Sequence, residues 1–426
     1  MRAPALIHDS RSRRGALRRC SALLAAALLN VSMAGCGKKE SSHAELTMWL
    51  VGSEAQARTI NQLAKAFTDR THIDVRCEAI AWGEAHSKYL TAVAGGVQPD
   101  IGTMGLTWGV EFGRLGTLVD LRKAFPDEVT VIQQKSFPGM WSSIEDGTAV
   151  YGIPFDLTVQ MMYYRTDLVP KLPEDWQELG ASLERLRQED RRMIIDWGSL
   201  SWIGYAPFLW QAGGDFYTPD KKPALNTPQA VQALEFFRDL YNVHQVPKTS
   251  IPVEQGLRTG EFPLAMSGNW KMTSLPAAVP EIAGKWAIGL LAKGPSGKRT
   301  AFLGGRILSV FANSKHQAEA WQFMMYLFEP DVQVTLYQSA VDTQDAYLPP
   351  NITTWDSLPM EQNMKTILKQ QAQEAKGPPG VEGWNESTRL VEQAIQRVIL
   401  HGADPKTELS QANDGMARAL ENAGKP

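Results

Sequence analysis

The sequence has little of what membrane-spanning, nucleic-acid-binding and disulfide-rich proteins need. No apolar run reaches the roughly 20 residues of a membrane-spanning helix. The formal net charge of −3 argues against nucleic acid as the main partner. Only 3 of the 426 residues are cysteine. The 43% share of hydrophobic and 21% share of charged residues is typical of a globular protein, and the length predicts about two or three domains.

Motifs that hold nucleotides and metals are also absent. There is no phosphate-binding loop, no Gly-x-Gly-x-x-Gly after a strand, no His-Glu-x-x-His and no Cys-x-x-Cys, and the histidines are scattered. These absences argue against a nucleotide, dinucleotide or zinc enzyme, and we expect no cofactor and no metal. They leave open a hydrolase with two paired carboxylates, because such pairs have no local signature.

The first 35 residues have the pattern of an export signal. They hold six arginines and a single acid, Asp9, so that the rest of the chain carries a formal net charge of −8. The apolar run of residues 21–29 is too short to span a membrane and fits the core of a signal peptide. We therefore predict that residues 1–35 are a signal peptide and that the protein is exported.

Small residues lead from this run to Cys36 and resemble the bacterial lipoprotein box, in which the cysteine is lipidated and becomes the first residue. The polar residues that follow predict a tether over 36–44 and a lipid anchor at the cell membrane. The alternative is an ordinary signal peptide with an incidental cysteine. Cys77 then has no disulfide partner, and its place on the apolar face of a strand predicts a buried, inert thiol.

Tryptophan is unusually frequent, with 13 residues. An indole ring can cover the apolar face of a sugar ring, while amides, carboxylates and arginines hydrogen-bond the hydroxyl groups. The excess therefore hints at carbohydrate binding, although large cores also use tryptophan.

Strands and helices alternate along the chain. Strands are predicted over 46–50, 73–80 and 99–104, with helices up to about residue 70 and near 84–94 between them. This order indicates a parallel sheet with helices on both faces. Ligands bind such sheets beyond the carboxyl ends of the strands, where residues 52–54, Trp82 and residues 105–108 fall. Further helices are predicted over 177–190, 229–243, 316–328 and 386–400.

The chain resembles a family, the bacterial extracellular solute-binding proteins of carbohydrate ABC importers, which are similar to maltose-binding protein. Five segments carry the resemblance in order: 99–121, 151–168, 210–215, 260–270 and 303–323. The second segment, with Gly-Ile-Pro and then Tyr-Tyr-Arg, is the most specific. The resemblance implies a two-lobed α/β periplasmic binding protein of the type II-like class, with a hinge and an interlobe cleft.

The implied lobes are interleaved along the chain. The N-terminal lobe would comprise 45–156 plus 300–333, and the C-terminal lobe 157–299 plus 334–426. The resemblance also implies a non-enzymatic monomer that binds a sugar in the cleft. It would deliver that sugar to ABC permease transmembrane subunits with a separate ATPase. A di- or oligosaccharide of the α-glucoside, maltose or trehalose type is expected.

Substrate-binding residues are carried over by the same resemblance. Asp156 is the acid expected to meet sugar hydroxyls at the first lobe crossing, with Thr158 and Gln160 on the same face of an extended segment; the alternative is that Asp156 caps the hinge. Trp270 is expected to stack on the sugar. The other expected site residues are Glu54, Trp108, Trp202, Asn269, Gly304, Gly305, Arg306 and Trp384.

Several of these assignments leave alternatives. Arg306 either holds a pair of sugar hydroxyls or pairs with an acid. Gly304 and Gly305 match a loop whose backbone N–H groups approach the sugar. One tryptophan among Trp197, Trp202 and Trp210 is expected in the cleft and the others in the core.

Two other functions remain as alternatives. A secreted glycoside hydrolase would need two carboxylates about 5–10 Å apart across the scissile bond. A binding protein for glycerol phosphodiester would favour several arginines or lysines, and one for a polyamine several cleft acids. The tryptophan excess favours sugar over both.

Overall fold

The computed structural model describes residues 44–423, so that the predicted signal peptide, Cys36 and nearly all of the tether lie outside the described residues. It begins with β1 (Glu45–Val51), α1 (Glu54–Thr71), β2 (Asp74–Ile80), α2 (Trp82–Gly95) and β3 (Ile101–Gly105). Strand β1 pairs in parallel with both β2 and β3, as predicted.

The later helices and strands also follow the periodicity of the sequence. Four predicted helices are present as α7 (Trp176–Gln188), α9 (Pro228–Asn242), α12 (Gln317–Leu327) and α15 (Trp384–His401). The other strands are β4 (Glu145–Asp146), β5 (Ala149–Val150), β6 (Ile153–Arg165), β7 (Met193–Ile195), β8 (Leu264–Gly268), β9 (Trp286–Gly289) and β10 (Leu303–Val310). The other α-helices are α3 (Trp108–Arg114), α4 (Leu121–Ala124), α5 (Pro126–Gln134), α6 (Pro138–Ile144), α8 (Trp202–Gln211), α10 (Val253–Thr259), α11 (Lys271–Ala278), α13 (Pro330–Thr343), α14 (Gln362–Gln373) and α16 (Pro405–Ala423).

One sheet runs through both halves of the described chain, in the order β2-β1-β3-β10-β6-β8-β7, with β9 also beside β6. The long strand β6 joins the halves. Its residues 153–159 pair with β10, whereas residues 160–165 pair with β8 and β9. We call the part built on β1, β2, β3 and β10 the first half, and the part built on β7, β8 and β9 the second half.

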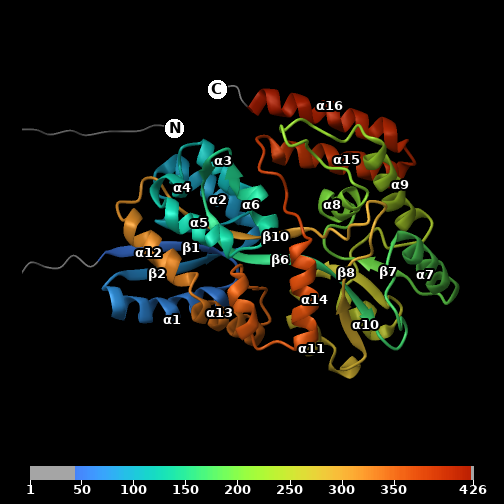
Figure 1. Cartoon of the computed structure of the whole chain (residues 1–426), viewed down its shortest axis with the longest axis horizontal. Helices are drawn as coiled ribbons and strands as arrows, with labels where there is room; N and C mark the ends of the chain where they lie inside the picture. Colours follow the sequence, from blue (N-terminus) through green and yellow to red (C-terminus); the bar gives the residue numbers. More distant parts are fainter. Residues whose placement is uncertain (1–43, 424–426) are drawn as a thin grey trace, which may run out of the picture. The chain divides into compact units, whose positions relative to one another are not determined.

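Helices cover both halves, as Figure 1 shows. Helices α1 to α6, α12 and α13 lie around the first half, and α7 to α11, α15 and α16 around the second, with α14 near the middle. The α/β fold predicted from the resemblance is thereby confirmed. The predicted lobe boundaries stay a prediction; the boundary between 333 and 334 falls inside α13, which packs against α1.

Helix α1 shows how the sequence positions a residue of the cavity described below. Ser53 caps the helix, because its side chain accepts a hydrogen bond of 3.1 Å from the backbone N–H of Gln56. Ala57, Ile60, Ala64 and Phe67 recur at helical spacing and are buried. Packing of this apolar face fixes the helix, and the first turn then holds Gln56 at the end of β1.

Cys77 is buried in β2, and burial raises the pKa of its thiol to about 12. The thiolate is the reactive form of cysteine, so that the predicted inert thiol agrees with this environment. Within residues 44–423, none of the helices has the length and apolar character needed to cross a membrane.

Candidate functional site

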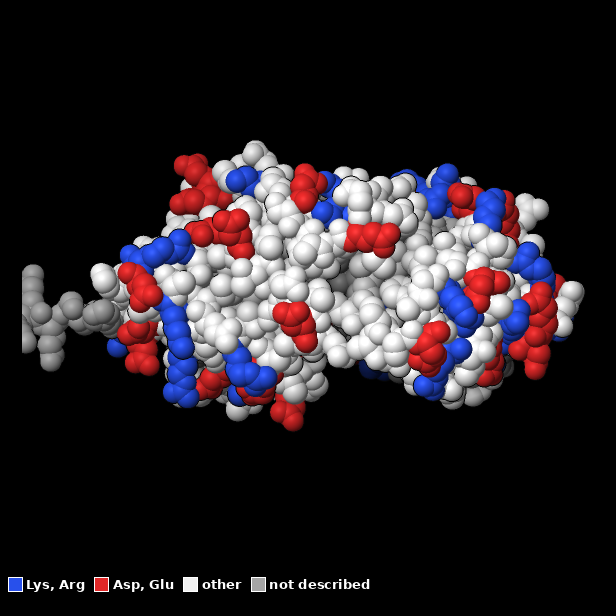
Figure 2. Space-filling view, turned by 90° about the horizontal axis from the view of Figure 1, so that it is seen from below, with Lys and Arg blue, Asp and Glu red and all other residues white. Residues whose placement is uncertain are grey.

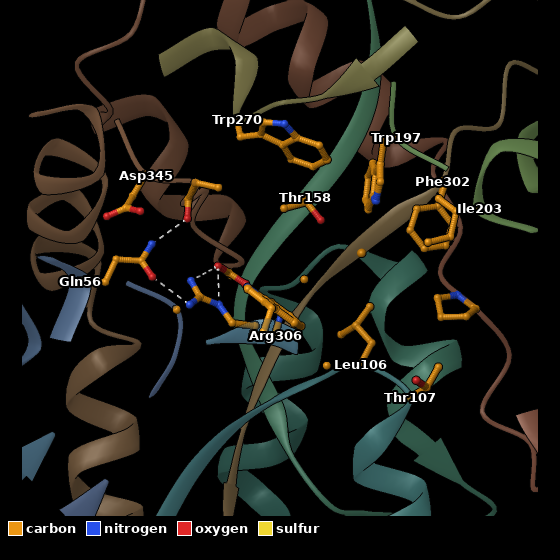
Figure 3. Close-up of a pocket in the computed structure, with 18 of the residues that line it drawn as sticks. Gln56, Leu106, Thr107, Thr158, Trp197, Ile203, Trp270, Phe302, Arg306 and Asp345 are labelled. Atoms are coloured by element: carbon orange, nitrogen blue, oxygen red, sulfur yellow. Dashed lines mark hydrogen bonds and ion pairs between the residues drawn. The ribbon is translucent and has the colours of Figure 1, made fainter. Parts of the chain in front are cut away.

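A cavity of about 730 Å³ lies between the halves, beside the paired strands β6 and β10. This volume is in the range of small-molecule sites. Figure 3 shows the cavity with side chains from both halves around it. Its lining comprises Gly52, Ser53, Gln56, Trp82, Gly105, Leu106, Thr107, Asp156, Thr158, Trp197, Trp202, Ile203, Trp270, Phe302, Gly304, Gly305, Arg306, Asp345, Ala346 and Pro378.

Aromatic rings form one wall of the cavity. The Trp197 ring meets Trp270 and Phe302 edge-to-face, with centroid distances of 4.8 and 4.9 Å, and Trp202 meets Phe302 at 5.3 Å. Gly268 at the end of β8 makes room for Trp270, because a Cβ there would overlap the indole ring. Trp270 is partly exposed, and Figure 3 shows its ring above Thr158, directed toward the cavity.

A buried ion pair joins the neighbouring strands β6 and β10. Asp156 of β6 accepts hydrogen bonds from the backbone N–H and the Nε of Arg306, at 2.8 and 3.0 Å, and from its Nη2. The Nη1 of Arg306 donates to the carbonyl of Val51 at 2.5 Å and to Gln56 Oε1 at 2.9 Å. Both charged side chains are almost fully buried, and the protein itself occupies their hydrogen-bonding groups. Of the two readings of Arg306, the structure has the arginine paired with an acid.

Gln56 and Asp345 extend this polar corner of the cavity. Gln56 Nε2 donates to the carbonyl of Ala346 at 3.0 Å. Asp345 Oδ2 accepts from the hydroxyls of Ser53 and Thr343, at 2.7 and 3.1 Å. Asp345 Oδ1 accepts no hydrogen bond from the described residues, and Asp345 takes part in no ion pair with them. Asp345 therefore supplies a negatively charged oxygen that is available to accept a hydrogen bond.

The two glycines at the crossing lie in strand β10, not in a loop as the resemblance implied. Gly305 has a φ of 138°, and a Cβ there would overlap the backbone of Asp156. A Cβ at Gly304 would lie 2.9 Å from Thr158 Oγ1 and 3.1 Å from the Trp197 ring. Their lack of side chains lets β10 pass close to β6, at the register shift between Arg306 and Ile307.

Seven of the twelve predicted substrate-binding residues line the cavity: Asp156, Thr158, Trp202, Trp270, Gly304, Gly305 and Arg306. The structure therefore brings strand β6, the Ser-Gly-Asn-Trp segment and the Gly-Gly-Arg segment to one place, although they are far apart in the chain. Their roles toward a ligand stay predictions.

The other five predicted residues do not line the cavity. Gln160 is buried and its Nε2 donates to the carbonyl of Trp197 at 3.1 Å, while Asn269 Oδ1 accepts from the N–H of Val159 at 2.9 Å. Trp384 is buried against Trp202, with ring centroids 5.0 Å apart. The two residues of the first half lie behind or outside the rim: Trp108 against Trp82 and His86, and Glu54 exposed on the first turn of α1.

Two tryptophans of the segment from Asp196 to Asp215 line the cavity, where one was expected. Trp197 and Trp202 face it, and Trp210 is buried in the core. The difference arises because Trp197 precedes helix α8 and Trp202 begins it, so that neither is buried inside the helix packing.

Sequence reasoning left some lining residues out of the predicted site. Gly52, Ser53, Trp82, Gly105, Leu106 and Thr107 belong to the strand-end loops that the alternating pattern had marked. Gln56, Ile203, Phe302, Asp345, Ala346 and Pro378 had no such signal. Only Gln56 could have been inferred, because it stands one helical turn beyond Ser53 and follows the same strand end.

Charge at the cavity is low. The Asp156–Arg306 pair is neutral as a unit, and Asp345 adds one carboxylate. Figure 2 shows a face that is hollowed near its middle, with largely uncharged atoms around the hollow and most charged side chains toward the two ends. Within residues 44–423, no group of His, Cys, Asp and Glu side chains could hold a metal ion.

Two halves joined by strand β6, with an aromatic and weakly charged cavity between them, are the features of a periplasmic-type binding protein. The profile of the family described as bacterial extracellular solute-binding protein matches residues 62–397. The chain belongs to this family.

Individual relatives support the same assignment. The chain is 23% identical to the galactooligosaccharide-binding protein of Bacillus subtilis over 422 residues, covering 93% of this chain and 96% of the relative. It is 26% identical to the lactose-binding protein of Rhizobium radiobacter over 351 residues, covering 76% and 78%. The solved structure of the sugar-binding protein MalE from Xanthomonas citri is similar in fold, with a TM-score of 0.80 at 23% identity, covering 89% of this chain and 98% of that one.

Proposed function

We propose that this chain is the exported binding component of an ABC importer and that it captures a neutral sugar of di- or oligosaccharide size in the cavity. The α-glucoside, maltose or trehalose type stays the expected class. The observation that carries the proposal is the aromatic wall formed by Trp197, Trp202, Trp270 and Phe302, together with the Asp345 carboxylate at the polar corner of the same cavity. Aromatic faces cover the apolar side of a sugar ring, and the carboxylate can accept hydrogen bonds from its hydroxyls.

The charges of the cavity disfavour the other solute classes. A phosphodiester needs cations that are free to bind it, but Arg306, the only cation among the lining residues, is already paired with Asp156. A polyamine needs several free acids, and Asp345 is a single one. A neutral ligand fits this balance best.

A glycosidase is also disfavoured by the pairing of Asp156. Hydrolysis needs one carboxyl group that donates a proton and a second carboxylate that acts as base or nucleophile. Asp156 and Asp345 are the only carboxylates among the described lining residues, and both oxygens of Asp156 already accept hydrogen bonds from Arg306. The proposed protein therefore binds its sugar and returns it unchanged.

Binding is proposed to close the two lobes on the sugar, because a ligand that touches both lobes stabilises the closed state by its differential affinity. The binding protein would act as a monomer, and the permease would recognise its closed form. A separate subunit would hydrolyse ATP. Strand β6 pairs with β10 in the first half and with β8 in the second, which supports a role for β6 in this movement.

The proposal is tested by a thermal-shift screen of the purified protein against a panel of neutral sugars, glycerol phosphodiesters and polyamines. A sugar present at 100 times its Kd should add about 2.7 kcal/mol of stability. Chromatography of the recovered sugar should show no conversion. Stabilisation only by a phosphodiester or a polyamine, or turnover of a glucoside in excess over protein, would contradict the proposal.

Lipid anchoring through Cys36 is the second part of the proposal, supported by the sequence of the lipoprotein box. Cys36→Ala should block lipidation, so that the variant stays unprocessed or leaves the membrane fraction. A normally processed variant that still fractionates with membranes would refute the anchor.

A further inference from the structure

The cavity has two chemically different ends, which Figure 3 shows on opposite sides of Thr158. Gln56, Asp345 and Arg306 form the polar end. The opposite end holds the apolar side chains of Leu106, Ile203 and Phe302, and Trp202 packs against Phe302 there. A ligand that fills the cavity must therefore present a different surface at each end.

The polar end can satisfy a hydroxylated ring. Asp345 Oδ1 and the hydroxyl of Thr158 have no hydrogen-bond partner among the described residues, and Figure 3 shows the Thr158 hydroxyl directed into the cavity. A carboxylate oxygen accepts and a hydroxyl both donates and accepts, which matches the hydroxyl groups of one sugar ring. Trp270 lies above the same region and can cover the apolar face of that ring.

The apolar end cannot satisfy a second ring in the same way. Among the lining side chains there, only the hydroxyl of Thr107 and the indole N–H groups of Trp197 and Trp202 can hydrogen-bond, and no carboxylate or amide is present. Each sugar hydroxyl placed against Ile203 or Phe302 would lose its water without gaining an acceptor. Every unpaired hydroxyl should weaken binding by about ten-fold.

We propose that the preferred ligand is a glycoside with one hydroxylated sugar ring at the Asp345 end and an apolar group, such as an aryl aglycone, at the Phe302 end. This inference rests on the proposed function of sugar capture and departs from the expected maltose or trehalose type, since it places an apolar group where a disaccharide has its second ring. An aryl ring against Trp202 and Phe302 buries apolar surface and leaves no polar group unpaired.

The test compares nitrophenyl glycosides with disaccharides that share the same first ring, measured by calorimetric titration of the purified protein. Glucose and galactose, in α and β linkage, supply the shared rings. For the sugar that binds best, the nitrophenyl glycoside should bind at least ten-fold more tightly than the matched disaccharide. Equal or tighter binding of the disaccharide overturns the inference and leaves the proposed function standing. If neither kind of glycoside binds, the inference fails, and the screen of neutral sugars described above decides the proposed function separately.

Matched variants locate the preference. Ile203→Thr keeps the branched shape and adds a hydroxyl at the apolar end, so that it should weaken the nitrophenyl glycoside about ten-fold and leave the disaccharide nearly unchanged. Ile203→Val, the shape control, should change either affinity less than three-fold. Asp345→Asn acts on the shared ring, so that it should weaken both ligands and keep their ratio. A ratio that moves with Asp345→Asn but not with Ile203→Thr would place the discrimination at the polar end and overturn the inference.

Discussion

Trp270 carries the sharpest prediction at the scale of single residues. Its ring lies over Gly268, edge-to-face with Trp197, and is only partly buried. Trp270→Ala removes an aromatic platform, and the affinity for the sugar should fall about ten- to several hundred-fold. The melting temperature should change little. Titration calorimetry and thermal unfolding measure the two quantities separately.

Trp355 is the matched control for this change. Its side chain is fully buried, and its Nε1 donates to the carbonyl of Pro349 at 2.9 Å, away from the cavity lining. Trp355→Ala should cost about 3–5 kcal/mol of unfolding free energy. A large loss of stability in Trp270→Ala, with its affinity kept, would show that Trp270 acts as a core residue.

The buried pair of Asp156 and Arg306 leads to a second prediction. Arg306→Met leaves the Asp156 carboxylate buried without its partner, which should cost about 3–5 kcal/mol in urea unfolding. The double variant Asp156→Leu with Arg306→Met should be less destabilised than Arg306→Met alone, because no buried charge remains. If the unfolding free energy of Arg306→Met is instead unchanged and only sugar binding is lost, the arginine contacts the ligand directly.

Some residue roles could be read from the sequence, and others could not. Trp270 follows a strand end and a glycine, and that pattern leads to the cavity. Trp384 has the same chemistry but lies on the buried face of α15, against Trp202 and Phe216. The local sequence around Trp384 does not show this burial, because the side of a helix that faces a cavity is fixed by packing against distant segments.

At the scale of elements, Gly305 is the position where the backbone of β10 tolerates no side chain. Its φ of 138° and its closeness to the backbone of Asp156 exclude a Cβ. Gly305→Ala should therefore cost about 1–3 kcal/mol and disturb the crossing that positions Asp156 and Arg306. Thermal unfolding and sugar titration should both respond.

Gly83 provides the control at this scale. It is exposed in α2, and a Cβ there would meet nothing within 4 Å. Gly83→Ala should be neutral or stabilise the protein by up to about 1 kcal/mol. If both glycine variants behave alike, close packing at the crossing is not what requires Gly305.

The regular elements were predictable because their periodicity follows from burial. The spacing of Ile60, Ala64 and Phe67 predicts α1, and the alternation around Cys77 predicts β2. The division of the long β6 into two pairing regions could not be predicted from the sequence, since its residues 153–165 are almost all buried and show no alternation. Its division between β10 and β8 depends on partners that follow it in the chain by more than 100 residues.

At the scale of the whole described chain, polar contacts connect the two halves outside the cavity lining. Asp146 of the first half accepts from Arg114 of α3, at 2.7 and 2.8 Å, and from Lys221 of the second half at 3.2 Å. Arg114 also pairs with Glu382, just before α15. A further contact runs from Asn385 of α15 to Glu111 of α3 at 3.2 Å. These contacts favour the arrangement in which the halves are together.

Lys221→Met should therefore lower the affinity for the sugar about two- to five-fold, because exposed ion pairs contribute about 0.2–1 kcal/mol each. The loss should shrink at high salt, where such pairs are screened. Lys222→Met is the control, since Lys222 pairs with Asp220 of its own turn.

Hydrogen bonds from Arg114 chiefly, and from Lys221, lower the pKa of Asp146 below its ordinary value. The carboxylate thus stays ionised above its unfolded pKa, and its contribution is lost only as the pH falls through the lowered folded pKa. The effect of Lys221→Met should accordingly be the same at pH 5 and pH 8 in calorimetric titration. An equal effect of Lys222→Met, or an effect that persists in high salt, would contradict a link between the halves.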